Sequence, residues 1–174
     1  NDQSGGLDNA KQNIDAWWPL LEQGVEAIVM TASGCGVMVK DYGHLFKNDP
    51  QYAAKAKTIS ELTKDISEIL PTLQSELLTL VGADPKPGVV YHPPCTLQHG
   101  QQIRGKVEGI LSSIGIGVNL CADSHLCCGS AGTYSVTQPE LSEQLRKNKL
   151  GHLQTACEES GAQFIVSGNI GCIM

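Results

Sequence analysis

The sequence predicts an α/β fold with two similar halves, each built on a short, mainly parallel sheet flanked by helices. Short apolar runs alternate with segments of helical periodicity, an order typical of parallel strands joined by crossover helices. A block at 24–38 recurs at 161–174, which indicates an internal repeat. Cysteines follow the ends of several apolar runs, where parallel α/β folds place their sites.

The repeat sets the expected domain organisation. "GVEAIVMTASGCGVM" aligns without gaps on "GAQFIVSGNIGCIM", so that Cys35 matches Cys172. The first copy continues into a helix-like stretch, whereas the second ends where that helix would begin. We expect 1–80 to hold the C-terminal part of a first repeat with connecting helices, 81–88 to be a linker, and 89–174 to be a second repeat, truncated at its end.

The elements of the first half follow from periodicity and capping residues. Residues 7–23 have apolar positions with a 3.6-residue period, which predicts a helix. The run at 26–31 is typical of a buried parallel strand. Asp49 is expected to cap a helix that begins next to it, and Thr58 with Glu61 forms the pattern of a capping box that would open another helix.

The second half repeats the alternation of strand and helix. "GVVYHPPC" at 88–95 predicts a strand that ends at two prolines, and 96–115 predicts one helix after it. The apolar run at 116–122 predicts a strand that leads into a Cys-Cys turn. A helix is then expected at 139–160, before the repeated block.

Composition excludes several classes of function. The net charge is −6 and no run of five basic residues occurs, which argues against a nucleic-acid surface. No stretch reaches the roughly 18 apolar residues of a transmembrane helix, although a peripheral membrane association stays open. Seven cysteines, an odd number, favour a metal or redox site in a reducing compartment over a set of disulfides.

Five of the cysteines stand where a site would form. Cys35, Cys95, Cys172 and the pair Cys127 and Cys128 each follow a predicted strand and loop. Because parallel strands end at one edge of a sheet, cysteines from separate loops can meet there. We therefore expect Cys95, Cys127, Cys128 and Cys172 to hold a metal or a cluster.

Other interpretations of the cysteines stay open. Free cysteine is often buried, and this is what we expect for Cys121 and Cys157. A vicinal disulfide within the Cys-Cys pair would suit a redox switch but leaves Cys95 and Cys172 unexplained. A closed four-cysteine zinc site is a further alternative to iron and sulfide.

Several neighbours of the cysteines are expected to support such a site without being ligands. His92, His99 and His125 lie close to the cysteines in sequence and are expected to donate hydrogen bonds, with His125 the first to be tested as a ligand. Gly129 and Gly132, the glycines of the CCGSAG segment, would let backbone N–H groups approach sulfur.

These motifs together resemble a known family. "YHPPCTLQHG", "CCGSAGTYSVTQPELSEQL" and "GAQFIVSGNIGC" are similar to the cysteine-rich CCG domain found in heterodisulfide reductases, in lactate-utilisation proteins and in anaerobic glycerol-3-phosphate dehydrogenases. "NIDAWWPLLEQG", "TASGCGVMVKDYG" and "DSHLCCGSAGTYS" resemble the glycolate oxidase iron–sulfur subunits of that family in particular. Such proteins carry two CCG repeats behind a ferredoxin-like domain, which implies that this sequence is a C-terminal fragment.

The resemblance implies a function in electron transfer. It implies an iron–sulfur subunit of an oxidoreductase that oxidises glycolate, a 2-hydroxy acid, and passes electrons from flavin-binding subunits toward the quinone pool. It also implies a cytoplasmic location, with peripheral contact to the inner membrane. The substrate-oxidising site would lie outside this segment, so no catalytic residue is expected here.

The resemblance also implies a ligand set. By position, Cys95, Cys127, Cys128 and Cys172 would hold a [4Fe–4S] cluster, cubane or non-cubane, and Cys35 would be the last ligand of the preceding repeat. Met38 stands where the reductase form has a further cysteine. Zinc is the alternative cofactor, and the chain would then be a docking domain for the flavin subunits without a redox role.

Overall fold

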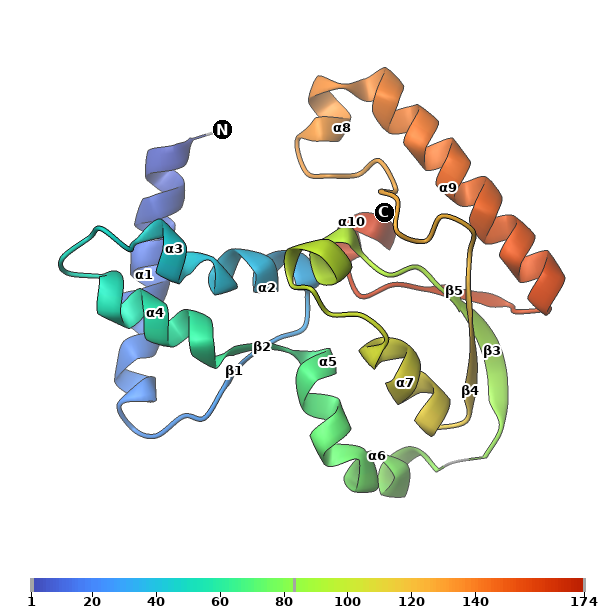
Figure 1. Cartoon of the computed structure of the whole chain (residues 1–174), viewed down its shortest axis with the longest axis horizontal. Helices are drawn as coiled ribbons and strands as arrows, with labels where there is room; N and C mark the ends of the chain where they lie inside the picture. Colours follow the sequence, from blue (N-terminus) through green and yellow to red (C-terminus); the bar gives the residue numbers. More distant parts are fainter. Residues whose placement is uncertain (1, 83, 174) are drawn as a thin grey trace. The chain divides into compact units, whose positions relative to one another are not determined.

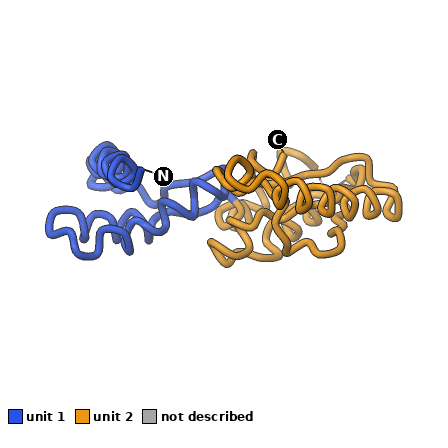
Figure 2. The backbone as a smooth tube through the Cα atoms, turned by 90° about the horizontal axis from the view of Figure 1, so that it is seen from above, with its two compact units in different colours: residues 1–66 blue, residues 67–174 orange. Residues whose placement is uncertain are grey.

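The computed structural model describes residues 2–82 and 84–173, which fall into two compact units, residues 1–66 and 67–174 (Figure 2). Each unit contains a parallel sheet with helices packed against it, so the predicted α/β class with short parallel sheets is confirmed. The stretch at 67–80, expected in the first half, lies in the second unit because its helices pack on a helix of that unit.

In the described part of the first unit, a two-stranded sheet is combined with four helices, whose arrangement can be followed in Figure 1. Its two strands are parallel, with Ile28 opposite Thr63 and Met30 opposite Asp65. The elements are α1 (Gln3–Leu21), β1 (Ile28–Met30), α2 (Ser33–Lys40), α3 (Tyr42–Leu45), α4 (Ala53–Leu62) and β2 (Thr63–Asp65), followed by α5 (Ile66–Ile69) at the boundary.

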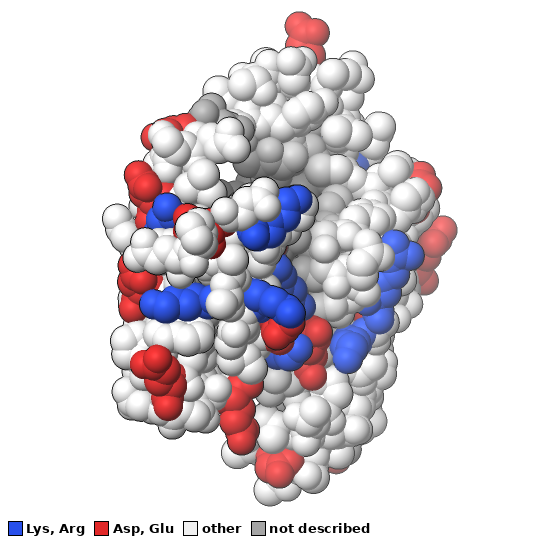
Figure 3. All heavy atoms as spheres, turned by 60° about the vertical axis from the view of Figure 1, so that its left-hand side comes forward, with Lys and Arg blue, Asp and Glu red and all other residues white. Residues whose placement is uncertain are grey.

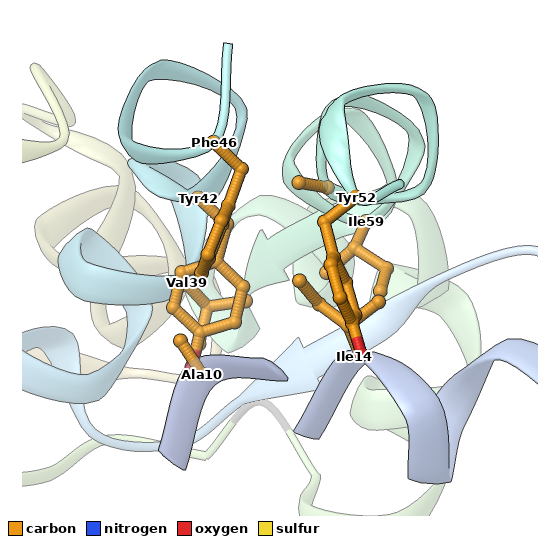
Figure 4. Close-up of a cluster of buried hydrophobic side chains, with 8 residues drawn as sticks. Ala10, Ile14, Val39, Tyr42, Phe46, Tyr52 and Ile59 are labelled. Atoms are coloured by element: carbon orange, nitrogen blue, oxygen red, sulfur yellow. The ribbon is translucent and has the colours of Figure 1, made fainter. Parts of the chain in front are cut away.

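An aromatic and aliphatic core holds the first unit together (Figure 4). Ile14 of α1 and Ile59 of α4 are both fully buried in it. The rings of Phe46 and Tyr52 pack with centroids 5.9 Å apart, and the Tyr52 hydroxyl donates a hydrogen bond of 2.8 Å to Asp15. The buried members are Ala10, Ile14, Val39, Tyr42, Phe46, Tyr52, Ala56 and Ile59.

The predicted helix starts around α4 are wrong. Thr58 opens no helix but lies inside α4, where its hydroxyl donates to the Ala54 carbonyl at 3.2 Å. The helix ends at Leu62 because the next three residues pair with β1, so tertiary pairing overrides the local helical pattern. Asp49 caps the turn that precedes α4, accepting the backbone N–H of Tyr52 at 3.1 Å.

The second unit is built on a three-stranded parallel sheet in the order β4-β3-β5. Val90 of the central strand lies opposite both Asn119 and Ile165. The elements are η1 (Leu70–Leu73), α6 (Gln74–Val81), β3 (Lys86–Tyr91), η2 (Thr96–Gly100), α7 (Lys106–Ser113), β4 (Ile116–Leu120), α8 (Tyr134–Thr137), α9 (Pro139–Ser160), β5 (Phe164–Val166) and α10 (Ile170–Ile173).

Two expectations for this unit need correction. The single helix expected at 96–115 is two, a short π-helical turn followed by α7, because Gln102 and Gly105 adopt left-handed φ angles of 58° and 72° between them. Strand β3 begins at Lys86, inside the expected linker, where it pairs with Ile116 of β4.

The internal repeat of the sequence is also present in the structure. A short strand, a loop and a helix occur in both copies, as β1 with α2 and as β5 with α10. Helix α2 begins at Ser33 and α10 at Ile170, which are matched positions of the two repeats. Cys35 and Cys172 are therefore each the third residue of their helix.

The surface charge follows the composition. On the face drawn in Figure 3, acidic side chains lie among and beside the basic ones.

Within the described residues, no helix has the length and apolar character that crossing a bilayer requires.

Gly129 lets the turn after β4 pack against the start of α9. Its φ of 90° lies in the left-handed region, and a Cβ atom there would overlap the Ser142 carbonyl oxygen. The Ser142 hydroxyl donates a hydrogen bond of 2.8 Å to the Gly129 carbonyl. The glycine thus allows a backbone approach that any side chain would block.

We predict that Gly129→Ala destabilises the second unit by about 3 kcal/mol, from left-handed strain plus steric overlap. Gly132→Ala is the matched control, because Gly132 also has a positive φ but has open space around its Cα. It should cost about 1 kcal/mol. Chemical denaturation of both variants measures the difference, and equal losses of stability would contradict the overlap.

Candidate metal centre

Three parallel strands deliver cysteines to the same edge of the second sheet. Cys95 follows β3, the Cys127–Cys128 pair follows β4, and Cys172 follows β5. Since β3 pairs in parallel with both of its neighbours, the chain leaves all three strands in the same direction. The loops after them are therefore neighbours in space although they are far apart in sequence.

Cys95 and Cys127 form one side of this cysteine cluster. The pKa of the Cys95 thiol is raised to about 11, first by burial and then by the charge and hydrogen bonding of the neighbouring Cys127. The backbone N–H of Gly129 donates to Cys127 Sγ at 3.3 Å. The turn thus provides the N–H···S hydrogen bond that its glycine predicts.

Cys128, Cys172 and His92 form the other side. One ligand atom from each residue lies within 4.8 Å of the other two. The hydrogen bond from Cys172, followed by the contact with His92, lowers the pKa of Cys128 to about 4, whereas the pKa of Cys172 is raised by the same Cys128 contact and by burial. Cys128 is therefore the thiolate of the pair. Asn169 Nδ2 donates to Cys172 Sγ at 3.6 Å.

His92 is buried at the centre without a good hydrogen bond. Only 2% of the residue is exposed, and neither ring nitrogen has a hydrogen-bond partner of acceptable geometry among the described residues. A buried polar group without a partner costs free energy. A metal or a cluster held by the adjacent thiols would supply the missing interaction, so this imidazole fits a metal centre.

The structure places the other two histidines differently. The His125 backbone carbonyl lies 2.9 Å from His99 Nε2, and the His125 side chain is exposed. Among the described residues, the group that could hold an ion contains His92 and neither of these. His92, which immediately follows β3, is thus the histidine that the fold brings to the cysteines.

Two further cysteines of the second unit belong to its apolar core. Cys121 is buried in an apolar group with Val90 and Leu153, and Cys157 packs against that group, as expected for core residues. Burial raises the pKa of Cys121. Cys35 lies in the first unit, where it is exposed.

A cavity of about 370 Å³ adjoins the centre. Its lining includes His92, Cys128 and Cys172, together with Arg146 and Lys149 of α9. Neither basic residue is among the site residues that the sequence predicts. Lys149 lies in the same inward-facing helical row as Leu153 and Ala156, where an apolar residue is expected. A lysine in such a row is the sequence signal that could have indicated its place at the site.

The donor set limits the chemistry of the centre. Thiolates with one imidazole are ligands that suit zinc and iron–sulfur clusters, and they suit magnesium or calcium poorly. Four cysteines from three loops at one sheet edge, with a buried imidazole beside them, form a donor set that suits either a zinc ion or a cluster.

Comparison with known proteins agrees with this geometry. The profile of a cysteine-rich domain, CCG, matches residues 89–174. The glycolate oxidase iron–sulfur subunit of Escherichia coli is 50% identical over 172 residues, which cover 99% of this chain and 40% of that protein. The probable glycolate oxidase iron–sulfur subunit of Bacillus subtilis is 30% identical, covering 99% and 37%.

A third relative is matched over more of its length. Lactate utilization protein A of Oceanobacillus iheyensis is 29% identical over 98% of this chain and 68% of its own. The chain spans less than half the length of the two glycolate oxidase subunits. Residues 89–174 are thus similar to the cysteine-rich CCG domain, and nearly the whole chain is similar to the glycolate oxidase iron–sulfur subunits.

Proposed function

We propose that this chain is part of an iron–sulfur electron-transfer subunit of a glycolate-oxidising complex. The observation that carries the proposal is the cluster of Cys95, Cys127, Cys128 and Cys172 at the carboxyl edge of a parallel sheet, with buried His92 beside it. The similarity of the chain to two glycolate oxidase iron–sulfur subunits, at 50% and 30% identity, supports it.

In this proposal the four cysteines hold a [4Fe–4S] cluster as thiolates. The cluster, when bound, stores and passes one electron at a time. The Gly129 N–H and the Asn169 amide hydrogen-bond to ligand sulfurs, an interaction that raises the reduction potential of such centres by stabilising added negative charge. Oxidation of glycolate belongs to flavin-binding partner subunits, and the electrons continue toward the quinone pool at the cytoplasmic face of the inner membrane.

Cys35 belongs to a second centre in this proposal. We assign residues 1–80 to the end of one repeat and 89–174 to the next, with Cys35 as the last ligand of the first repeat. The matched strand–loop–helix surroundings of Cys35 and Cys172 support this role. The exposure of Cys35 is consistent with ligands that come from another part of the full-length protein.

A zinc-stabilised docking domain is the second candidate function. It is favoured by how tightly His92, Cys128 and Cys172 group, with their ligand atoms within 4.8 Å. With zinc bonds of about 2.3 Å to sulfur and about 2.0 Å to nitrogen, the ligand atoms of one tetrahedral ion lie roughly 4 Å apart. Such a site would stabilise a surface for the flavin subunits and carry no electrons.

Metal analysis of the anaerobically purified full-length protein separates the two functions. We expect iron and acid-labile sulfide, and we expect Cys128→Ser to abolish the signal of this cluster because it removes a thiolate ligand. Cys121→Ser is the control, since Cys121 is buried in the core away from the cluster. Zinc at one per repeat, with iron and sulfide both absent, would overturn the redox function.

The thiol pKa values predict a pH-dependent reactivity of the metal-free protein. Because the pKa of Cys128 is lowered to about 4, its thiolate persists as pH falls from 9 and is lost only near pH 4, whereas Cys95, with a pKa of about 11, stays protonated throughout. At pH 6 we expect iodoacetamide to alkylate Cys128 on the order of 100-fold faster than Cys95, after allowing for the lower nucleophilicity of a low-pKa thiolate.

Mass spectrometry of timed samples measures both rates. Both cysteines are half-buried, so access alone does not favour either residue. Equal rates at pH 6, or a Cys128 rate that rises only above pH 8, would contradict the assignment of the thiolate.

A further inference from the structure

We propose that Lys149 supplies the buried positive charge that balances the negative charge of the cysteine centre and raises its reduction potential. The proposal rests on the proposed function, since it requires an anionic metal–thiolate centre. Lys149 lies beside the cysteine ligands and acts on the metal centre through its positive charge.

The first observation is the position of Lys149 in α9. Lys149, Leu153 and Ala156 are the buried residues of this helix, spaced four and three residues apart on one face. Lys149 is 4% exposed, while its neighbour Leu150 is 53% exposed. The helix therefore turns a lysine inward and a leucine outward, the reverse of what burial of apolar surface favours.

The second observation is that Lys149 pairs with no carboxylate within the part of the chain that the structure describes. Lys149 Nζ donates a hydrogen bond of 2.6 Å to the Asp123 backbone carbonyl. No ion pair found among residues 2–82 and 84–173 includes Lys149. A carbonyl bears only a partial charge, and a buried ammonium needs a full countercharge to offset its lost hydration.

The third observation is what Lys149 faces. It lines the cavity that also contains His92, Cys128 and Cys172. Its charge is close enough to Cys95 and to Cys121 to favour their thiolate forms. Arg146, the other cation of this lining, is instead paired with Glu143 at 2.8 Å. The cysteine cluster is thus the available countercharge for Lys149.

The consequence for redox chemistry follows from Coulomb's law. A centre held by four thiolates is anionic, and reduction adds one more negative charge. A fixed positive charge in a site of low dielectric stabilises the reduced form more than the oxidised form and so raises the potential. An exposed lysine has a much smaller effect because water and salt screen it.

The variants have to distinguish the effect of the Lys149 charge from the effect of its hydrogen bond to the loop. The Asp123 carbonyl that it binds lies in the loop leading to Cys127 and Cys128, so loss of the side chain also loosens this loop. Lys149→Gln keeps a hydrogen-bond donor and removes the charge. Lys149→Arg keeps both. Lys149→Met removes both in an apolar form of similar length that suits a buried helix face.

The test is the midpoint potential of the centre in the metal-loaded, full-length protein, identified as the signal that Cys128→Ser abolishes. We expect Lys149→Gln to lower the equilibrium constant for reduction of the centre about tenfold, which for one electron is a midpoint potential lower by about 59 mV. Lys149→Arg should keep the wild-type potential. Lys147→Gln is the matched control on the same helix, because the Lys147 side chain is 72% exposed, and it should change nothing.

The potentials of the variants decide whether the charge of Lys149 acts on the centre. If Lys149→Gln does not fold, Lys149→Met takes its place with the same expected shift. A wild-type potential in the charge-free variants, or an equal shift in Lys149→Arg, overturns the role of the charge and leaves the proposed function intact.

Zinc binding distinguishes failure of the function from failure of the inference. If the protein binds zinc alone, electron transfer fails, and Lys149 is then tested by zinc affinity. A dissociation constant that rises about tenfold in Lys149→Gln but stays unchanged in Lys149→Arg supports charge balance, and equal affinities overturn it. A protein that binds neither zinc nor iron overturns both proposals.

Discussion

The site depends on the parallel pairing of three strands. Since β3 is paired in parallel on both sides, the loops after β3, β4 and β5 leave the sheet in one direction, and each of these loops carries cysteine. Antiparallel pairing of any strand would send its cysteines to the opposite edge. The repeat reproduces one part of this arrangement, because β1 with α2 has the same local structure as β5 with α10 and carries Cys35 where the second copy carries Cys172.

Electrostatics determines what can occupy this edge. Sulfur atoms so close together cannot all carry charge without a cation. The pKa values of Cys128 and Cys172 shift in opposite directions, chiefly because Cys172 donates a hydrogen bond to Cys128, so one thiol of the pair keeps its proton. His92 brings an imidazole without hydrogen-bond partners of acceptable geometry within the described part of the chain, and Lys149 brings a buried cation. These features are costly in an apolar core and become favourable around an anionic metal centre.

Prediction from sequence succeeded where local pattern and tertiary pairing agree. The strands at 116–122 and in the repeated blocks, and the helix at 139–160, are present because apolar period, length and turn residues all favour the same element. It failed at Thr58, where helical periodicity continues through residues that instead pair with β1. It failed again at 96–115, where left-handed residues interrupt a pattern that is typical of one helix.

The sequence by itself determined the α/β class, the internal repeat and the cysteines that follow the strands, because strand ends, glycines and spacing are local properties. Only the tertiary structure decided which side chains join them. His92 rather than His125 lies beside Cys128 and Cys172, and Lys149 turns inward toward the same cavity. How deeply His92 and Lys149 are buried, and which polar groups each can reach, depends on contacts between distant segments, so a single sequence does not reveal it.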